Sequence, residues 1–373
     1  MEKIKKNFGF GFMRLPMKDG EIDTEETKRM VDAFLDAGFN YFDTAHGYHK
    51  EKSEIALREC LTSRYLRESY VLADKLTENY FKTEADIRPV LEEQLAACGV
   101  EYFDFYLMHS QCALNYPHFK ACRAYETAFA LKAEGKVRHV GISFHDRAEV
   151  LEQILTKYPE IEVVQIQFNY LDYDDPAVQS RKCYEVCVKH GKPVIVMEPV
   201  KGGMLANVPD DVMVEMKAND AAASPASYAI RFAASLDGVM VVLSGMSSME
   251  QVEDNTAYMQ DMKPLTEKEQ AITLHAKEAY RRVWKYNCAD FDKLDDNAAG
   301  VPISGIIRAY NSLLIQPNPY FGAELNYYKT FRSAYDRTFE TADYSAQTEV
   351  IGGAFDVNKA LRESIEFQAK NGF

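Results

Sequence analysis

The stretch VRHVGISFHDRAEVLEQILTKYPEIEVVQIQFN (137–169) contains two apolar runs separated by a segment of helical period. The runs VRHVGIS (137–143) and VVQIQFN (163–169) have the length and the β-branched content of strands. Between them, DRAEVLEQILTKY (146–158) spaces its apolar residues as an amphipathic helix does. Two apolar strands joined by a helix predict a parallel β-α-β unit whose helices cover the sheet.

The same alternation runs along most of the chain. Six further strand candidates lie at 8–15, 41–44, 70–75, 103–109, 193–199 and 240–245, and helical segments between them include 24–38, 84–99 and 224–235. Eight strands separated by helices predict an α/β fold, a parallel sheet closed into a (β/α)8 TIM barrel. A doubly wound open sheet is the alternative, but the G-x-G-x-x-G turn expected after its first strand is missing from MRLPMKDGE (13–21).

The alternation ends near residue 262. We therefore predict a barrel over residues 1–262 and a C-terminal, mainly helical or irregular appendage over residues 263–373. Helix is expected at 265–284, near 300–315 and at 356–370.

Composition and charge disfavour several classes of protein. The net charge of −14 disfavours a nucleic-acid binder and a protein that docks on an anionic membrane. The basic first residues are not followed by an apolar stretch long enough for a secretory signal, and no apolar run approaches the roughly 20 residues of a membrane span. Seven scattered cysteines predict reduced thiols in a cytoplasmic protein. Cys183 and Cys187 share a helical spacing but lack partners at metal-site spacing, so we expect packing residues and no metal site.

Four ionisable residues follow neighbouring strands. Asp43, Lys75 and His109 end the second, third and fourth strand candidates, and Tyr48 lies in the loop after Asp43. Because a barrel brings the carboxyl ends of its strands to one face, these side chains should converge there. Taken singly, they could be a turn residue, a solvated charge, a core histidine and a rim aromatic. Together they are harder to explain structurally, because charges at the centre of a barrel are costly unless paired.

The four residue types suggest proton transfer. A free phenol titrates near pH ~10 and is a poor donor at neutrality. An ammonium beside it favours the phenolate and lowers the pKa, while a carboxylate holds the ammonium in place. We therefore predict that Tyr48 is a general acid tuned by Lys75 and Asp43, and that His109 orients a carbonyl group.

These residues, in this order, resemble the aldo-keto reductase family. The motifs FDTAHGY (42–48), ADK (73–75) and LMHS (107–110) match its catalytic motifs. The resemblance covers roughly residues 8–262 and continues through VGIS (140–143), IQFNYL (166–171), EPVKGGML (198–205), SPASYAIRF (224–232) and VLSGMSSMEQVEDN (242–255).

The resemblance implies an NAD(P)H-dependent oxidoreductase that transfers hydride from nicotinamide C4 to an aldehyde or ketone, with Tyr48 protonating the oxygen. It assigns Ser143 and Gln167 to the carboxamide. It also assigns the nicotinamide and pyrophosphate to Pro199, Val200, Gly203 and Leu205, and the adenosine end to Ser244, Gly245, Gln251 and Asn255. From the residues alone, Ser143 could instead cap a strand and Gly202–Gly203 could be a simple turn, although the matching series of motifs favours the cofactor site.

Two departures from the family pattern matter. The adenosine segment 244–255 contains no lysine or arginine to pair with a 2′-phosphate, which favours NADH at least as much as NADPH. The appendage resembles the ferredoxin-like tail of one subfamily, but no cysteine follows Cys288, so we expect no iron–sulfur cluster. By this resemblance, Asn287, Asp290, Lys293 and Asn297 occupy the positions of the cluster cysteines.

The substrate and the biological role stay open at this stage. Loops at 109–119 and 200–211 and the tail segment 318–331 are candidates for the pocket, and their aromatic residues suit a partly apolar carbonyl or alcohol substrate or simple packing. The alternative to an enzyme is a catalytically weak nucleotide-binding regulatory or scaffold protein on the same barrel.

Overall fold

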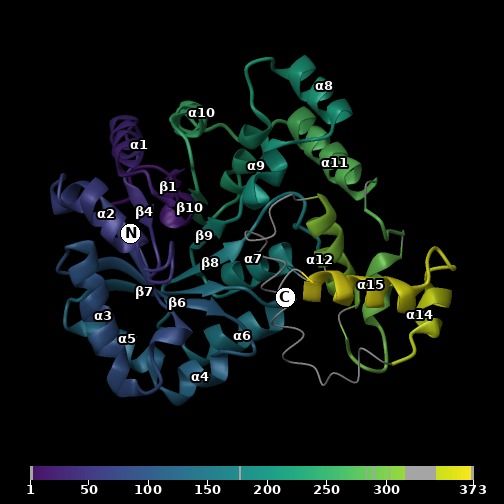
Figure 1. Ribbon diagram of the computed structural model, residues 1–373, viewed down its shortest axis with the longest axis horizontal. Helices are drawn as coiled ribbons and strands as arrows, with labels where there is room; N and C mark the ends of the chain where they lie inside the picture. The colour runs from purple at the N-terminus through teal and green to yellow at the C-terminus, as the bar shows by residue number, and fades with distance from the viewer. Residues whose placement is uncertain are drawn as a thin grey trace.

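Eight parallel strands close into a barrel in the computed structural model, which describes residues 3–370 apart from 176–177, 283, 289, 302 and 316–341 (Figure 1). The first strand pairs with both the second and the last strand of the barrel, which excludes an open sheet and confirms the predicted TIM barrel. The strands are β1 (Phe8–Gly11), β4 (Tyr41–Asp43), β5 (Val71–Leu76), β6 (Phe103–Gln111), β7 (Val137–Phe144), β8 (Val163–Gln167), β9 (Val194–Met197) and β10 (Val239–Ser244).

A short antiparallel hairpin follows the first strand and was not expected from the sequence. It pairs β2 (Met17–Lys18) with β3 (Glu21–Ile22). Its turn residues Asp19 and Gly20 both have positive φ, 53° and 84°, which matches the preference of Asp-Gly for tight hairpin turns. The two strands are too short and too polar to give an alternating hydrophobic signal.

Helices follow the strands around the barrel. The first of them is capped by Asp23, whose side chain accepts a hydrogen bond from the Glu26 amide at 3.0 Å. Cys183 and Cys187 are buried in the core, as packing residues should be. The helices are α1 (Thr24–Asp36), α2 (Ser53–Leu57), α3 (Glu84–Cys98), α4 (Tyr116–Ala121), α5 (Ala124–Ala133), α6 (Ala148–Lys157), α7 (Ser180–Lys189), α8 (Asp210–Asn219), α9 (Pro225–Ala234) and α10 (Met249–Met259).

The interior of the barrel is mainly apolar. Side chains from six strands fill it, namely Tyr41, Val71, Ala73, Phe105, Leu107, Val163, Ile195, Val241 and Leu243. These side chains fill the centre of the barrel, as in other closed eight-stranded barrels.

The C-terminal tail lies on one side of the barrel (Figure 1). Its described helices are α11 (Glu267–Arg282), α12 (Ile303–Ile315), α14 (Ser345–Val350) and α15 (Val357–Lys370), so helix is confirmed in the three expected regions. Residues of α12 and α15 share an apolar cluster with Tyr344 and Ile351, which flank α14. Ile272, Ala276 and Tyr280 of α11 instead pack in one cluster with residues of α8 and α9. The domain boundary at 262 stays a prediction, because α11 shares this core with the barrel.

The tail positions expected to correspond to cluster cysteines make internal contacts. The Asn297 amide donates to the carbonyls of Leu294 and Val301, and Lys293 pairs with Asp290 at 2.9 Å. Cys288 is half-buried. The absence of an iron–sulfur cluster stays a prediction.

Membrane-spanning helices and metal-binding clusters are both absent from the described residues. No helix found there combines the length and apolar character needed to cross a bilayer. The same residues include no group of three histidine, cysteine or acidic side chains arranged to hold a metal ion.

Candidate active site

Asp43, Tyr48, Lys75 and His109 converge at the carboxyl end of the barrel. The Lys75 ammonium donates hydrogen bonds to Asp43 Oδ1 at 2.5 Å and to the Thr44 carbonyl at 2.7 Å. It also lies 5.1 Å from the centroid of the Tyr48 ring, and the His109 ring lies 5.8 Å from the same ring, edge to face. The convergence expected from the strand order is therefore present.

Lys75 and Asp43 form a buried ion pair. The Lys75 side chain is 1% exposed and that of Asp43 is 5% exposed. Gln165 on β8 donates to the second carboxylate oxygen of Asp43 at 3.2 Å, so both oxygens of Asp43 have a partner. A solvated surface charge would not be enclosed in this way, and this rules out the simpler explanation for Lys75.

Burial and ion pairing shift the pKa values of Lys75 and Asp43 in opposite directions. Burial alone would lower the pKa of Lys75, but the neighbouring Asp43 and Tyr48 raise it above its usual value. For Asp43, burial raises the pKa and Lys75 partly offsets this effect. Lys75 is therefore held as an ammonium at neutral pH.

The pKa of Tyr48 differs in direction from the sequence expectation. Burial raises it above the usual value, and Asp43 adds to this effect, while Lys75 lowers it. The ammonium thus acts in the expected sense but does not outweigh the loss of hydration around the phenol. Burial could not be judged from the spacing of the residues.

Burial lowers the pKa of two histidines at this end of the barrel, His109 and His145. Burial, and then Lys75, hold the pKa of His109 well below its usual range, and its Nδ1 is 2.7 Å from the Thr77 hydroxyl. When Thr77 donates to Nδ1, the Nε2 of His109 carries the proton and can donate to a ligand. His145, which the sequence did not single out, lies 3.5 Å from the Ser143 hydroxyl, and burial lowers its pKa to about 4.

A cavity of about 290 Å³ lies at the same end of the barrel, beyond the carboxyl ends of β9 and β10. Seven of the ten residues expected to bind the cofactor line it, namely Pro199, Val200, Gly203, Ser244, Gly245, Gln251 and Asn255. Leu205 is fully buried in an apolar cluster instead. Gly202 and Gly203 have φ of 66° and 97°, so this turn requires glycines in addition to lining the cavity.

Ser143 and Gln167 lie at the ends of β7 and β8, and both are buried. The Gln167 amide nitrogen donates to Asp172 Oδ2 at 2.8 Å, which fixes the orientation of the amide because a carboxylate only accepts. Its Oε1 is buried and has no hydrogen-bond partner within the described structure. This acceptor suits an amide N–H donor such as that of a nicotinamide carboxamide.

Charged residues that the sequence did not point to also line the cavity. Arg14, which follows β1, pairs with Glu198 at 2.9 Å. Glu250 and Asp254 bring carboxylates to the segment expected at the adenosine end, and Asp254 accepts from the Ser224 hydroxyl at 2.6 Å.

Aromatic residues of the loop at 109–119, expected to form part of the substrate pocket, pack in the core. Tyr116 and Phe119 are buried in the outer core, which favours packing for the aromatic residues of 109–119. Segment 318–331 lies outside the described residues.

Comparison with known proteins decides the family. The sequence model of the Aldo/keto reductase family matches residues 7–273. The chain belongs to this family. Over 268 residues, an uncharacterized oxidoreductase of Schizosaccharomyces pombe is 25% identical, covering 68% of this chain and 81% of that protein. A putative aryl-alcohol dehydrogenase of Saccharomyces cerevisiae is 43% identical over 65 residues, 17% of each chain. The chain aligns with 17–30% of the length of three such yeast proteins.

Solved aldo-keto reductases share the barrel. One from Klebsiella pneumoniae, in complex with NADPH, superposes with a TM-score of 0.59 at 20% identity over 73% of this chain and 91% of that chain. At this identity the likeness shows the fold alone.

The buried pair generates a stability prediction. Asp43→Asn leaves the Lys75 ammonium without its carboxylate, and removing one partner of a buried pair costs about 3–5 kcal/mol. Urea unfolding of wild type, Asp43→Asn and the double variant Asp43→Asn/Lys75→Met measures the free energy of unfolding. The second substitution removes the unpaired ammonium and should recover part of the lost stability.

A matched control uses an exposed pair. Arg88 and Glu134 pair at 2.6 Å with about half of each side chain exposed, so Glu134→Gln should cost about 1 kcal/mol or less. An equal cost for Asp43→Asn and Glu134→Gln would contradict a desolvated Lys75.

Proposed function

We propose that this protein is an NAD(P)H-dependent oxidoreductase that reduces the carbonyl group of an aldehyde or ketone, or oxidises the corresponding alcohol. The observation that carries the proposal is the buried Lys75 ammonium between the Asp43 carboxylate and the Tyr48 ring. An apolar barrel has no structural need for a charge at this place, whereas a phenol that donates a proton needs a nearby cation to stabilise the phenolate.

Each residue of the centre has a distinct part. The reduced nicotinamide, when bound, supplies hydride to the carbonyl carbon. Tyr48 donates its proton to the carbonyl oxygen, and Lys75 stabilises the resulting phenolate. Neutral His109, in the tautomer in which Thr77 donates to Nδ1, donates a hydrogen bond to the same oxygen from Nε2. Asp43 keeps Lys75 charged and in place.

The cofactor site is proposed from the same geometry. Gln167 Oε1, which lacks a partner within the described structure, would accept from the nicotinamide carboxamide, with Ser143 beside it. The cavity lined by the 199–203 turn and the 244–255 segment would hold the rest of the dinucleotide. A nucleotide-binding scaffold would explain this cavity but would leave the buried Asp43–Lys75 pair without a role.

Tyr48→Phe tests the proton donor. General acid catalysis contributes on the order of 10²–10⁴-fold, so turnover of a good carbonyl substrate should fall by that factor while cofactor affinity stays close to that of wild type. Steady-state kinetics by nicotinamide absorbance and fluorescence titration of the cofactor measure the two quantities.

A second tyrosine provides the control. Tyr80 contacts the His46 ring, 4.4 Å between centroids, in the neighbouring loop, and Tyr80→Phe should change turnover by no more than about twofold. Near-full activity of Tyr48→Phe would contradict its role. Tight cofactor binding without turnover of any carbonyl compound by wild type would favour the scaffold.

The residues at the proposed adenosine end of the cavity predict how the protein chooses between NADH and NADPH. Carboxylates in this region repel a 2′-phosphate and can accept a hydrogen bond from a ribose 2′-hydroxyl. Because Glu250 and Asp254 line the cavity and Arg14 pairs with Glu198, NADH should bind no more than about tenfold worse than NADPH, or roughly 1.4 kcal/mol. Fluorescence titration of both nucleotides against wild type and Arg14→Met tests this. A hundredfold preference for NADPH that disappears in Arg14→Met would show that Arg14 turns from Glu198 to the phosphate.

A further inference from the structure

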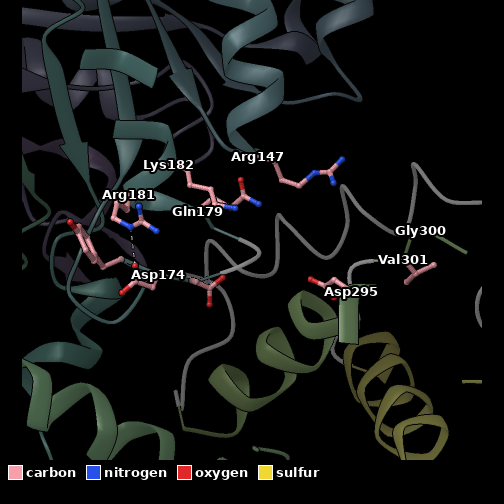
Figure 2. Close-up of a pocket in the computed structure, with 10 residues that line it drawn as sticks. Arg147, Asp174, Gln179, Arg181, Lys182, Asp295, Gly300 and Val301 are labelled. Carbon is pink, nitrogen blue, oxygen red and sulfur yellow. Dashed lines mark hydrogen bonds and ion pairs between the residues drawn. The ribbon is translucent and has the colours of Figure 1, made fainter. Parts of the chain in front are cut away.

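The tail meets the barrel beside the loop that follows β8. Figure 2 shows Asp174, Arg181 and Lys182 of the barrel on one side of a cavity of about 410 Å³, with Asp295 and Val301 of the tail on the other. The carboxylates here already have partners, since Asp174 pairs with Arg181 at 3.0 Å and Asp295 accepts from the Ser304 hydroxyl at 2.6 Å. With three cations and three carboxylates among its lining residues, this cavity does not select for a charged ligand.

A buried arginine joins the two parts next to this cavity. Arg308 of α12 is 3% exposed; its Nε pairs with Asp175 and its Nη2 lies 3.5 Å from Asp172 Oδ1. Its guanidinium also lies 4.5 Å from the centroid of the Trp284 ring. The tail therefore places a desolvated cation against two carboxylates of the barrel.

Asp172 connects this cation to the candidate cofactor site. The same carboxylate, itself fully buried, accepts from Lys201 at 2.7 and 2.9 Å and from Gln167 at 2.8 Å. Lys201 belongs to the turn that lines the cofactor cavity, and Gln167 carries the unpartnered acceptor. Although burial alone would raise the pKa of Asp172, Lys201 and Arg308 hold it below the usual value.

We infer that Arg308 is a positioning residue for the cofactor: through Asp172 it fixes the orientation of the Gln167 amide that receives the nicotinamide carboxamide. The inference rests on the proposed function and goes beyond it by giving the tail a part in cofactor binding. Removing Arg308 takes a cation from two buried carboxylates, Asp172 and Asp175. With less positive charge to offset its own, the Asp172 carboxylate should move toward water or closer to Lys201. Either movement frees the Gln167 amide to rotate, which weakens cofactor binding without touching Tyr48 or Lys75.

The test compares two matched substitutions in the tail. Arg308→Met removes the buried cation, while Arg362→Met on α15 removes an exposed one. Arg308→Met should raise the Kd of NADH about tenfold, Arg308→Lys should raise it less, and Arg362→Met should leave it unchanged. Urea unfolding of each variant reports whether the tail stays folded against the barrel, since Trp284 emission would respond directly to the loss of the Arg308 guanidinium over its ring.

A double-mutant cycle separates positioning from general destabilisation. In a Gln167→Met background, Arg308→Met should raise the Kd of NADH less than about threefold, because the amide that it orients is already gone. Asp175→Asn, which keeps Arg308 but removes its second partner, gives an independent variant if Arg308→Met does not fold, and it should also weaken NADH binding.

The outcomes are distinct. Wild-type affinity for NADH in folded Arg308→Met, or an equal loss with and without the Gln167 amide, would overturn the positioning role and leave the proposed function intact. Failure of the wild-type protein to bind either nucleotide would instead contradict the proposed function itself.

Discussion

The carboxyl end of this barrel depends on one buried ion pair. Lys75 and Asp43 face each other across neighbouring strands, with Gln165 on the far side of the carboxylate. Two desolvated charges are tolerated only when each satisfies the other. This constraint places the ammonium beside Tyr48, and the acid–base chemistry that we propose follows from that position.

A second cluster of buried charged residues is centred on Asp172, in the loop that follows β8. Asp172 gathers Lys201, Gln167 and Asn169 around one carboxylate, and Arg308 reaches it from the tail. In the function that we propose, the Asp43–Lys75 pair would assist proton donation by Tyr48, and the cluster around Asp172 would position the cofactor. The tail is thus in contact with the polar rim of the barrel, in addition to the apolar contacts of α11 with α8 and α9.

The barrel was predictable because its signals are local. Each strand is a short apolar run, and Asp43, Lys75 and His109 lie at strand ends, so closing the barrel brings them together. Partners set by tertiary packing were not predictable: Gln165 lies 122 residues from Asp43, and Arg308 lies more than 130 residues from Asp172. The direction of the Tyr48 pKa was missed for the same reason, because burial depends on the whole fold.

The central claim is that Lys75 lowers the pKa of the Tyr48 phenol against the effect of burial. Protein labelled with ¹³Cζ-tyrosine, with the Tyr48 signal assigned from its loss in Tyr48→Phe, allows this pKa to be followed by NMR in wild type and in Lys75→Met. The account predicts that the phenol stays protonated to higher pH in Lys75→Met than in wild type. An unchanged or lower pKa in Lys75→Met would contradict it.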